Sequence, residues 1–368
     1  MAKNNDYGTI DKMLLYVTLV LLAIGLVMVF SASSYDAMIS YKDAMFFFKR
    51  QLVWAAAGIV AMIFMMVIPV ELVKKLMAPA TGVIMIALVA VLFFGSESHG
   101  ATRGFRISGM QISPAEFAKP ICIVMYAQIL SWMGSLTKTT KGFLVAIGIL
   151  AVPILPIIIE DLGTAVCLAL TLGCMLVVAG IKFRQLLTLG VMGGGLAVVF
   201  IAIKPYRVKR FFSFLDPFSD PTGSGWQIVQ SLYALGSGGL FGVGLGNSRQ
   251  KMLYLPERHT DFIYAIICEE LGIIGAMAVV LLFLYFLYRG CLVAQHLEDN
   301  FMSYAAFGLT LIVVIQAYVN IAVVIGLFPI TGITLPLISY GGSSLLCTLA
   351  SIGFLLNLSR YADKPRHK

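Results

Sequence analysis

Hydrophobic segments follow one another along almost the whole chain. Ten can be drawn, near residues 14–32, 51–69, 76–94, 114–133, 143–159, 163–181, 186–203, 262–288, 304–327 and 337–358. A helix needs about 20 predominantly apolar residues to cross a bilayer, and these segments are close to that length. The pattern predicts an all-α polytopic membrane protein, a single domain over residues 1–368 with about ten transmembrane helices.

The composition supports a membrane protein. The chain is 60% hydrophobic and only 12% charged, whereas a soluble domain carries about 25% charged residues. The net charge of +8 would suggest acidic partners in a soluble protein. Because much of this charge lies at the ends of hydrophobic segments, we attribute it to membrane topology and expect no nucleic-acid partner.

The distribution of basic residues predicts the orientation. An even number of spans puts both termini on one side, where the short polar segments hold 13 Lys and Arg residues, against five in the opposite short loops. Basic residues in short loops are enriched on the cytoplasmic side. We therefore expect both termini in the cytoplasm and the long connection over about 204–260 on the outer surface, between spans seven and eight.

This outer loop opens with a basic cluster formed by Lys204, Arg207, Lys209 and Arg210. The cluster has two interpretations: contact with anionic lipid headgroups, or a clamp on a phosphate-bearing substrate, since Arg forms bidentate bonds to phosphate oxygens. The glycine-rich run at 236–246 indicates turns, and it lacks the G-K-S/T ending of a nucleotide-binding loop. A long loop with this much local detail is expected to be functional.

The end of the outer loop is rich in ionisable residues. Glu257, Arg258, His259 and Asp261 precede the eighth span within five positions. Thr260 and Asp261 both suit a helix N-cap, but a cap does not require the other charged neighbours. Asp261 is therefore the candidate catalytic base, with Glu257 and His259 as candidate supporting residues.

Two adjacent carboxylates follow inside the apolar run. On an ideal helix that begins at Asp261, Glu269 lies about 80° from the Asp261 face and about 12 Å deeper, and Glu270 points to the opposite side. Buried carboxylates are costly in a membrane unless they face a cavity or a partner. We expect one of them to face a wet cavity, with Glu269 as the candidate site residue, and the other to pair with a basic residue.

The fourth span opens with a charged pair. Glu116 and Lys119 stand at i and i+3, so they share a helix face and can form an ion pair, and Ser113 can cap the helix before Pro114. The pair has two interpretations: it holds two helices together, or it lines the same cavity as Asp261.

The last outer loop, residues 329–344, interrupts helical backbone at membrane depth with Pro329, Pro336 and Gly341-Gly342. Such backbone is tolerated only where protein or water covers it. The loop is interpreted either as a re-entrant cavity wall, with Ser339 as a candidate substrate-binding residue, or as a tight loop with a small-residue packing face.

Three of these stretches together resemble the SEDS family of shape, elongation, division and sporulation proteins. They are LPERHTDFIYAIICEELG, DPFSDPTGSGWQIVQSLYALGSGGLFGVGLGNSRQK and PITGITLPLISYGGSS, in this order along the chain. GVGLGNSRQK, TGITLPLISYGGSSL and LLNLSRY are more similar to the division and sporulation branch than to the elongation branch. The family usually shows Q-P-S-E-F-x-K at the fourth span, so Glu116 and Lys119 are kept here, while Ser113 and Ala115 depart from it.

The resemblance implies peptidoglycan glycosyltransfer at the outer face of the bacterial cytoplasmic membrane. The substrate is lipid II, a disaccharide-pentapeptide on undecaprenyl diphosphate, and the family's essential aspartate corresponds to Asp261. An α-linked donor and a β-1,4 product require one inverting displacement, with a base at the acceptor hydroxyl and cationic groups at the leaving diphosphate. Arg207, Lys209, Arg210 and Lys119 are candidates for the latter, and Mg²⁺ or Mn²⁺ could bridge Asp261 to phosphate oxygens.

The resemblance also implies partners: a class B penicillin-binding protein and other division membrane proteins. Two alternative functions stay open. A flippase for a lipid-linked precursor also needs a wet cavity and basic residues, although transporters usually carry internal repeats, and no repeat is evident. A non-catalytic scaffold for division enzymes is the other alternative.

Overall fold

The computed structural model describes residues 8–98, 101–107, 110–203 and 205–362. The helices are α1 (Lys12–Tyr41), α2 (Phe46–Val67), α3 (Val70–Phe94), α4 (Pro114–Met133), α5 (Thr140–Glu160), α6 (Leu162–Val178), α7 (Phe183–Ile203), α8 (Pro205–Leu215), α9 (Trp226–Gly238), α10 (Ile263–His296), α11 (Asn300–Val324) and α12 (Gly342–Ala362), with a 3₁₀ turn at Gly134–Lys138. Nine of the described helices are long and apolar enough to cross a membrane, and α6 is a shorter apolar helix. Each predicted segment corresponds to one of these ten helices, which confirms the polytopic α-helical fold.

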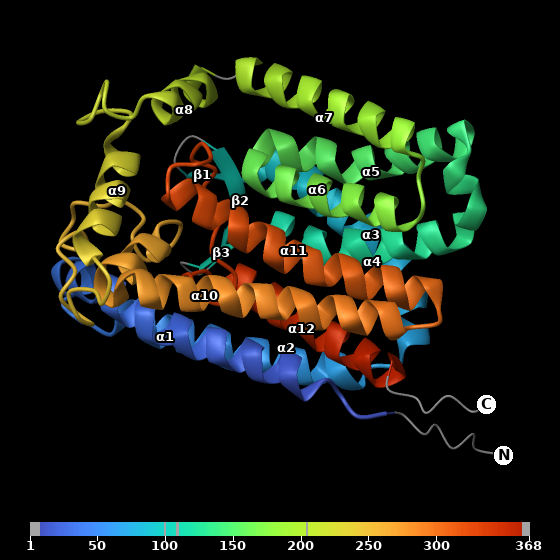
Figure 1. Cartoon of the computed structure of the whole chain (residues 1–368), viewed down its shortest axis with the longest axis horizontal. Helices are drawn as coiled ribbons and strands as arrows, with labels where there is room; N and C mark the ends of the chain where they lie inside the picture. Colours follow the sequence, from blue (N-terminus) through green and yellow to red (C-terminus); the bar gives the residue numbers. More distant parts are fainter. Residues whose placement is uncertain (1–7, 99–100, 108–109, 204, 363–368) are drawn as a thin grey trace.

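The long helices lie side by side along the long axis of the molecule (Figure 1). The start of α1 and the end of α12 meet at one end of this bundle. There the Gly8 amide donates to the Arg360 carbonyl over 3.1 Å, and the Asp11 amide donates to Ser359 Oγ over 2.9 Å. The start of α1 and the end of α12 therefore lie on the same side, as the even number of spans predicts.

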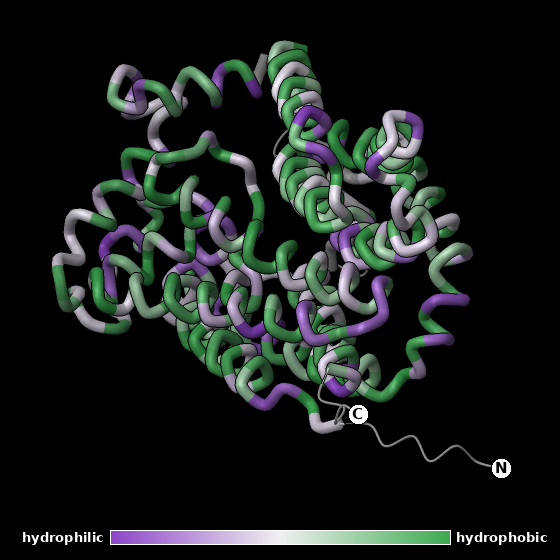
Figure 2. The backbone as a smooth tube through the Cα atoms, turned by 45° about the vertical axis from the view of Figure 1, so that its right-hand side comes forward, coloured by the Kyte–Doolittle hydropathy of each residue, from purple (hydrophilic) through white to green (hydrophobic). Residues whose placement is uncertain are grey.

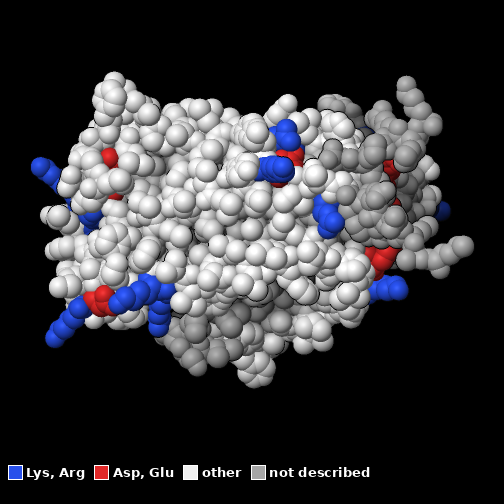
Figure 3. Space-filling view, turned by 90° about the horizontal axis from the view of Figure 1, so that it is seen from below, with Lys and Arg blue, Asp and Glu red and all other residues white. Residues whose placement is uncertain are grey.

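The middle of the bundle is formed by α11 and α12, which are largely buried. Helix α12 packs most extensively against α2, and α11 packs against α10, α4 and α6. Helix α7 is the opposite case, since almost all of it is exposed along one edge of the bundle (Figure 1). Hydrophobic residues predominate along the helices (Figure 2). On the face shown in Figure 3, charged side chains gather in a few groups with wide uncharged areas between them. Such a surface suits helices that face lipid as well as one another.

Two features of the connections were not predicted from the sequence. Strands β1 (Ser96–Ser98), β2 (Ala101–Ile107) and β3 (Met110–Ile112) form a small antiparallel sheet in the order β1-β2-β3 between α3 and α4. The long loop after α7 contains α8 and α9. The last hydrophobic segment also differs, because its helix begins at Gly342 and residues before it form the irregular loop expected from the two prolines.

Helix α10 is broken near its start. Gly272 has φ 68° and ψ −170°, which is not helical, and glycine reaches positive φ without steric cost. The glycine-rich loop fills the break: Val243 and Gly244 amides donate to the carbonyls of Glu269 and Glu270, over 2.9 and 3.1 Å. On the other side, Ile273 and Ile274 amides donate to the carbonyls of Gly239 and Leu240, over 3.0 and 3.3 Å. The loop therefore satisfies the polar backbone that the break exposes, as an apolar environment requires.

Candidate active site

The cavity that borders the predicted site, named the main cavity below, lies where the loop before α10, the loop before α12 and the start of α4 meet. Its volume is about 380 Å³. It is lined by Phe47, Arg50, Trp54, Ser113, Ala115, Glu116, Glu160, Asp161, Thr260, Gly332, Thr334, Tyr340, Gly341, Gly342, Ser343 and Ser344. Segments far apart in the sequence, including the Glu116 region and the loop at 329–344, therefore share one polar cavity.

Asp261 lies in a turn immediately before α10 and is half-buried. The helix begins at Ile263, so Asp261 is not on its face, and the ideal-helix placement predicted from the sequence is wrong. Thr260 lines the cavity, whereas Asp261 is not among its described lining residues. The carboxylate thus belongs to a turn at the edge of the cavity, and its position depends on how that turn is held.

The loop before α12 holds this turn. Ser339 is buried, and its hydroxyl donates to the Thr260 carbonyl over 2.6 Å while accepting from the Leu335 amide over 2.8 Å. The Tyr340 amide donates to the His259 carbonyl over 2.8 Å. The predicted site residue Ser339 is thus committed to backbone, and it acts on Asp261 by fixing the residue before it.

Asn320, on α11, also holds this turn and was not identified from the sequence. Its amide Nδ2 donates to the Asp261 carbonyl over 2.7 Å and to the Ile333 carbonyl over 2.8 Å. A signal was present, because Asn320 and Gln316 are polar residues four apart in an apolar run, where they share one helix face. Asn320 is a positioning residue for Asp261.

We expect Asn320→Ala to lower kcat by about 10-fold or more and to leave KM nearly unchanged, because Asp261 is the predicted base and small displacements of a catalytic group are costly. Asn357→Ala is the matched control. Asn357 lies near the C-terminal end of α12, and its Nδ2 also donates to two carbonyls, those of Met65 and Ile68. Both variants lose stability through unpaired buried carbonyls, and only Asn320→Ala is expected to lose kcat. Equal kcat values in steady-state assays of the two variants would contradict the positioning role.

His259 packs against two aromatic rings, which also contact each other. Its ring centroid lies 4.6 Å from that of Phe47 and 5.6 Å from that of Tyr340. Burial lowers the pKa of His259, and the Arg258 charge acts in the same direction, whereas Glu257 and Asp36 act against it. The imidazole is therefore held neutral near pH 7.

This depressed pKa predicts how stability depends on pH. Below about 6.5, the ordinary pKa, the unfolded chain binds a proton at His259 that the folded chain resists. The free energy of unfolding should therefore fall as the pH decreases through this range. Thermal unfolding between pH 5 and 8 measures the effect, and His259→Phe, which keeps an aromatic ring, should show a smaller decrease. An identical pH dependence in the variant and the wild type would show that His259 is not the group responsible.

Glu257 and Arg258 support the turn. Glu257 Oε2 accepts a hydrogen bond from Thr260 Oγ1 over 2.6 Å, and Arg258 pairs with Asp36 of α1 over 3.2 Å. Glu257 has a positive φ of 52°, which is uncommon for a residue with a side chain. These two residues therefore shape the backbone immediately before Asp261.

The predicted pair on α4 is present. Lys119 Nζ lies 2.7 Å from Glu116 Oε2 and donates to Gln316 Oε1 over 2.6 Å. Gln316 Nε2 in turn donates to the Thr334 carbonyl over 3.0 Å. The geometry confirms the first interpretation, since the pair links α4 to α11 and the loop at 329–344. Glu116 also lines the main cavity, next to Thr260 rather than Asp261, so a cavity shared with Asp261 stays a prediction.

The basic cluster is divided among different environments. Arg207 is buried and donates to the carbonyls of Ile158 and Ile159 at the end of α5, over 3.0 and 3.3 Å. Arg207 and Arg210 line a second cavity of about 120 Å³ that shares Glu160 and Asp161 with the main one. Lys209 is exposed, and Lys204 lies outside the described residues. The two arginines are thus the members of the cluster that border a cavity.

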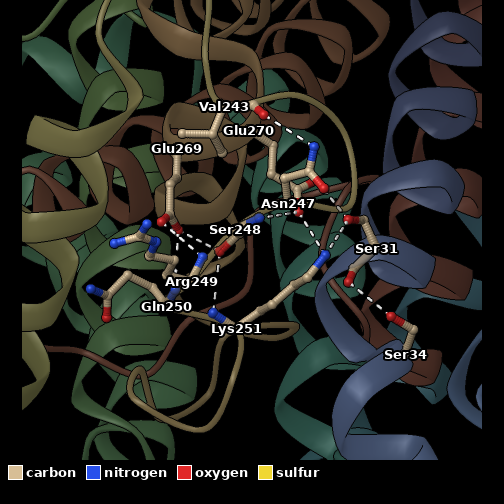
Figure 4. A network of polar contacts seen from close by, with 10 residues as sticks. All are labelled: Ser31, Ser34, Val243, Asn247, Ser248, Arg249, Gln250, Lys251, Glu269 and Glu270. Atoms are coloured by element: carbon tan, nitrogen blue, oxygen red, sulfur yellow. Dashed lines mark hydrogen bonds and ion pairs between the residues drawn. The ribbon is translucent and has the colours of Figure 1, made fainter.

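Glu269 and Glu270 face the loop at 248–251 (Figure 4). Glu269 accepts from the Ser248 hydroxyl and from the Arg249 amide over 3.0 Å. Glu270 pairs with Lys251 over 2.9 Å and accepts from Ser31 Oγ of α1 over 2.6 Å. The expected basic partner is confirmed for Glu270. The expected wet cavity is wrong for Glu269, which is buried because the loop amides and a hydroxyl satisfy its carboxylate.

Comparison with known sequences identifies one family. The family model described as "Cell cycle protein", for FtsW, RodA and SpoVE, matches residues 11–364. Stage V sporulation protein E of Bacillus subtilis is 43% identical over 356 residues, which cover 96% of this chain and 97% of that protein. A probable peptidoglycan glycosyltransferase FtsW of Trichlorobacter lovleyi is 40% identical over 355 residues, covering 95% of this chain and 93% of that protein.

Solved structures show the same likeness. A chain from the work described as "Structural coordination of polymerization and crosslinking by a peptidoglycan synthase complex" has a TM-score of 0.79 and 27% identity, covering 95% of this chain and 98% of that one. The crystal structure of the rod shape determining protein RodA of Thermus thermophilus has a TM-score of 0.72 and 25% identity, covering 97% and 98%.

Proposed function

This chain belongs to the FtsW, RodA and SpoVE family of cell cycle proteins, and on that premise we propose that it polymerises lipid II into β-1,4-linked glycan strands. It is a peptidoglycan glycosyltransferase of cell division or sporulation, embedded in the membrane as a multi-pass protein. The relatives named FtsW carry this activity in their names, and the similarity covers almost the whole length of both chains.

One observation supports the assignment most strongly: a polar cavity of about 380 Å³ is bordered by Thr260, next to Asp261, and by Glu116, the partner of Lys119. The second cavity, with Arg207 and Arg210 among apolar side chains, adjoins it at Glu160 and Asp161. A polar chamber next to an arginine-containing apolar chamber suits a substrate that combines a saccharide, a diphosphate and a lipid.

In the proposed mechanism, Asp261 takes the proton from the acceptor 4-hydroxyl as that oxygen attacks the anomeric carbon of the donor sugar. The bond from this carbon to the diphosphate breaks in the same displacement, and the electron pair leaves with the undecaprenyl diphosphate. Configuration inverts from α to β. A base at the nucleophile contributes about 100-fold to 10,000-fold to the rate, and Lys119, Arg207 and Arg210 favour the departing anion by their charge.

A divalent cation is compatible with this site. No group of three or more His, Cys, Asp or Glu residues in the described part of the chain could hold a metal ion by itself. Mg²⁺, however, commonly uses one or two carboxylates and completes its shell with substrate phosphates and water. Asp261 is the carboxylate that would hold Mg²⁺ or Mn²⁺, and the ion would neutralise charge on the leaving diphosphate.

The orientation and the partner are part of the proposal. With both ends of the chain in the cytoplasm, as the basic residues of the short loops favour, the cavity opens at the outer membrane face. The related chain of known structure comes from a complex that couples polymerization and crosslinking. A class B penicillin-binding protein, which crosslinks strands, is the partner that fits this chain.

The proposed function is tested with the purified chain reconstituted in vesicles that contain lipid II, with and without EDTA. If the chain is a polymerase, glycan strands form and can be separated by length on a gel. If the reaction requires divalent cations, no strands form in EDTA. Movement of lipid II between leaflets without strands would support a flippase. Normal growth and division of cells that carry Asp261→Ala would support a non-catalytic scaffold.

A further inference from the structure

Glu160 is a buried carboxylate with no hydrogen-bond partner in the part of the chain that the structure describes. It is the last residue of α5 and is only 2% exposed. Neither of its carboxylate oxygens accepts a hydrogen bond from any described residue. A buried charge or polar group normally costs several kcal/mol unless it is paired, so such groups in folded proteins are almost always satisfied.

The surroundings of Glu160 make this position still less favourable for structure alone. A helix C-terminus carries partial negative charge and favours cations, and the next residue is another carboxylate, Asp161. Asp161 has a structural role, since it caps α6 by accepting from the Gly163 amide over 3.0 Å and from Thr164 Oγ1 over 3.0 Å. Glu160 has no comparable role among the described residues, so we look for its partner in a bound molecule.

Glu160 is one of two residues, with Asp161, that line both the main cavity and the arginine-containing cavity. It therefore stands at the junction between the two chambers. Arg207 and Arg210 border the smaller chamber together with apolar side chains such as Phe211 and Phe328. That chamber fits a diphosphate and the adjoining part of an isoprenoid chain.

The chemistry of the substrate decides what can meet Glu160. A diphosphate has no hydrogen-bond donor at neutral pH, and its negative charge repels a carboxylate. A lipid chain has no polar group. The sugar attached to the diphosphate offers hydroxyl and amide N–H donors, and it must lie beside the diphosphate because the two are covalently joined.

We propose that Glu160 is a substrate-binding residue that accepts hydrogen bonds from hydroxyl or amide N–H groups of the phosphate-linked sugar, at the junction of the two cavities. This inference rests on the proposed function, since it takes lipid II as the substrate. It assigns a specificity role: Glu160 distinguishes the sugar-bearing lipid from the bare lipid diphosphate.

The test compares Glu160→Gln with the wild type, using Glu298→Gln as the matched control. Glu298 is exposed at the end of α10, so the same chemical change is made outside both cavities. Affinities are measured in detergent by titration with lipid II and, separately, with undecaprenyl diphosphate. Because the amide of the introduced glutamine cannot reproduce both acceptor oxygens, hydrogen bonds to the sugar are lost, and we expect lipid II to bind Glu160→Gln about 10-fold or more weakly. KM should rise in parallel, and undecaprenyl diphosphate should bind at least as tightly as it does to the wild type.

Thermal unfolding separates this role from a structural one. If Glu160 stabilised the fold, Glu160→Gln would melt at a lower temperature. A residue that is unsatisfied in the free protein should instead leave the melting temperature unchanged or raise it, as is common when a binding residue is replaced. A lower melting temperature with unchanged lipid II affinity would overturn the proposal.

Two further outcomes are decisive. In the first, Glu160→Gln binds both undecaprenyl diphosphate and lipid II more weakly, and EDTA has the same effect on the wild type. This result would overturn the sugar contact and assign Glu160 to a cation at the diphosphate. Equal lipid II affinity in wild type and Glu160→Gln would overturn the inference while leaving the polymerase assignment intact. Failure of the wild type to polymerise lipid II would instead remove the proposed function itself.

Discussion

Asp261→Asn is expected to lose lipid II polymerisation by at least about 100-fold while it folds as the wild type does, because loss of a general base costs about that much or more. Asparagine keeps the size and the polar character of the side chain. The contacts that hold the turn involve the backbone carbonyls of Asp261 and Thr260, so they survive the substitution. Initial rates of lipid II consumption and thermal unfolding of the same preparation measure the two parts of this prediction.

The control for this variant is Asp43→Asn. Asp43 lies in the loop between α1 and α2, where it pairs with Lys49 over 2.8 Å at an exposed position. An exposed pair contributes about 0–1 kcal/mol to stability, so this variant should retain both fold and activity. If Asp261→Asn polymerises at the rate of Asp43→Asn, then Asp261 is not the base.

The second large effect concerns the buried pair behind the broken helix. Glu270 is fully buried and pairs with Lys251 over 2.9 Å. Removing one member of a buried pair leaves the other charge uncompensated, which typically costs about 3–5 kcal/mol. We therefore expect Glu270→Gln to lower the melting temperature strongly, and to weaken the contact between α1, α10 and the loop at 248–251 (Figure 4).

A double variant makes this prediction specific. Replacing both members, as Glu270→Gln with Lys251→Met, removes the uncompensated charge and should recover much of the lost stability. Lys49→Ala, at the exposed Asp43–Lys49 pair, should change the melting temperature little. If Glu270→Gln melts like Lys49→Ala, the buried pair does not contribute in the way that its geometry implies.

The membrane fold followed from the sequence because long apolar segments have few alternatives in a bilayer. The Glu116–Lys119 pair could also be predicted, since residues three apart on a helix lie on one face. The irregular loop at 329–341 followed from its prolines and glycines. In each case the structure depends on residues close together in the sequence or on the apolar environment of the membrane.

What could not be predicted depends on long-range contacts. The break at Gly272 requires the loop at 239–244 to form hydrogen bonds with the freed backbone groups. The sequence around Gly272 does not identify that loop as the partner. Asn320 reaches Asp261 across 59 positions of sequence. In the sequence, Glu160 is only a polar residue at the end of an apolar segment. Its position between two cavities is visible only in the fold.

The central claim is that this chain joins lipid II into glycan strands. It is tested most directly with the purified chain and lipid II in detergent, because without a membrane the movement of lipid between leaflets cannot contribute to the result. The account predicts strands of many disaccharides that a muramidase cuts at β-1,4 bonds. If the folded chain, assayed with Mg²⁺ and together with the proposed partner, a class B penicillin-binding protein, leaves lipid II unpolymerised, the account is contradicted.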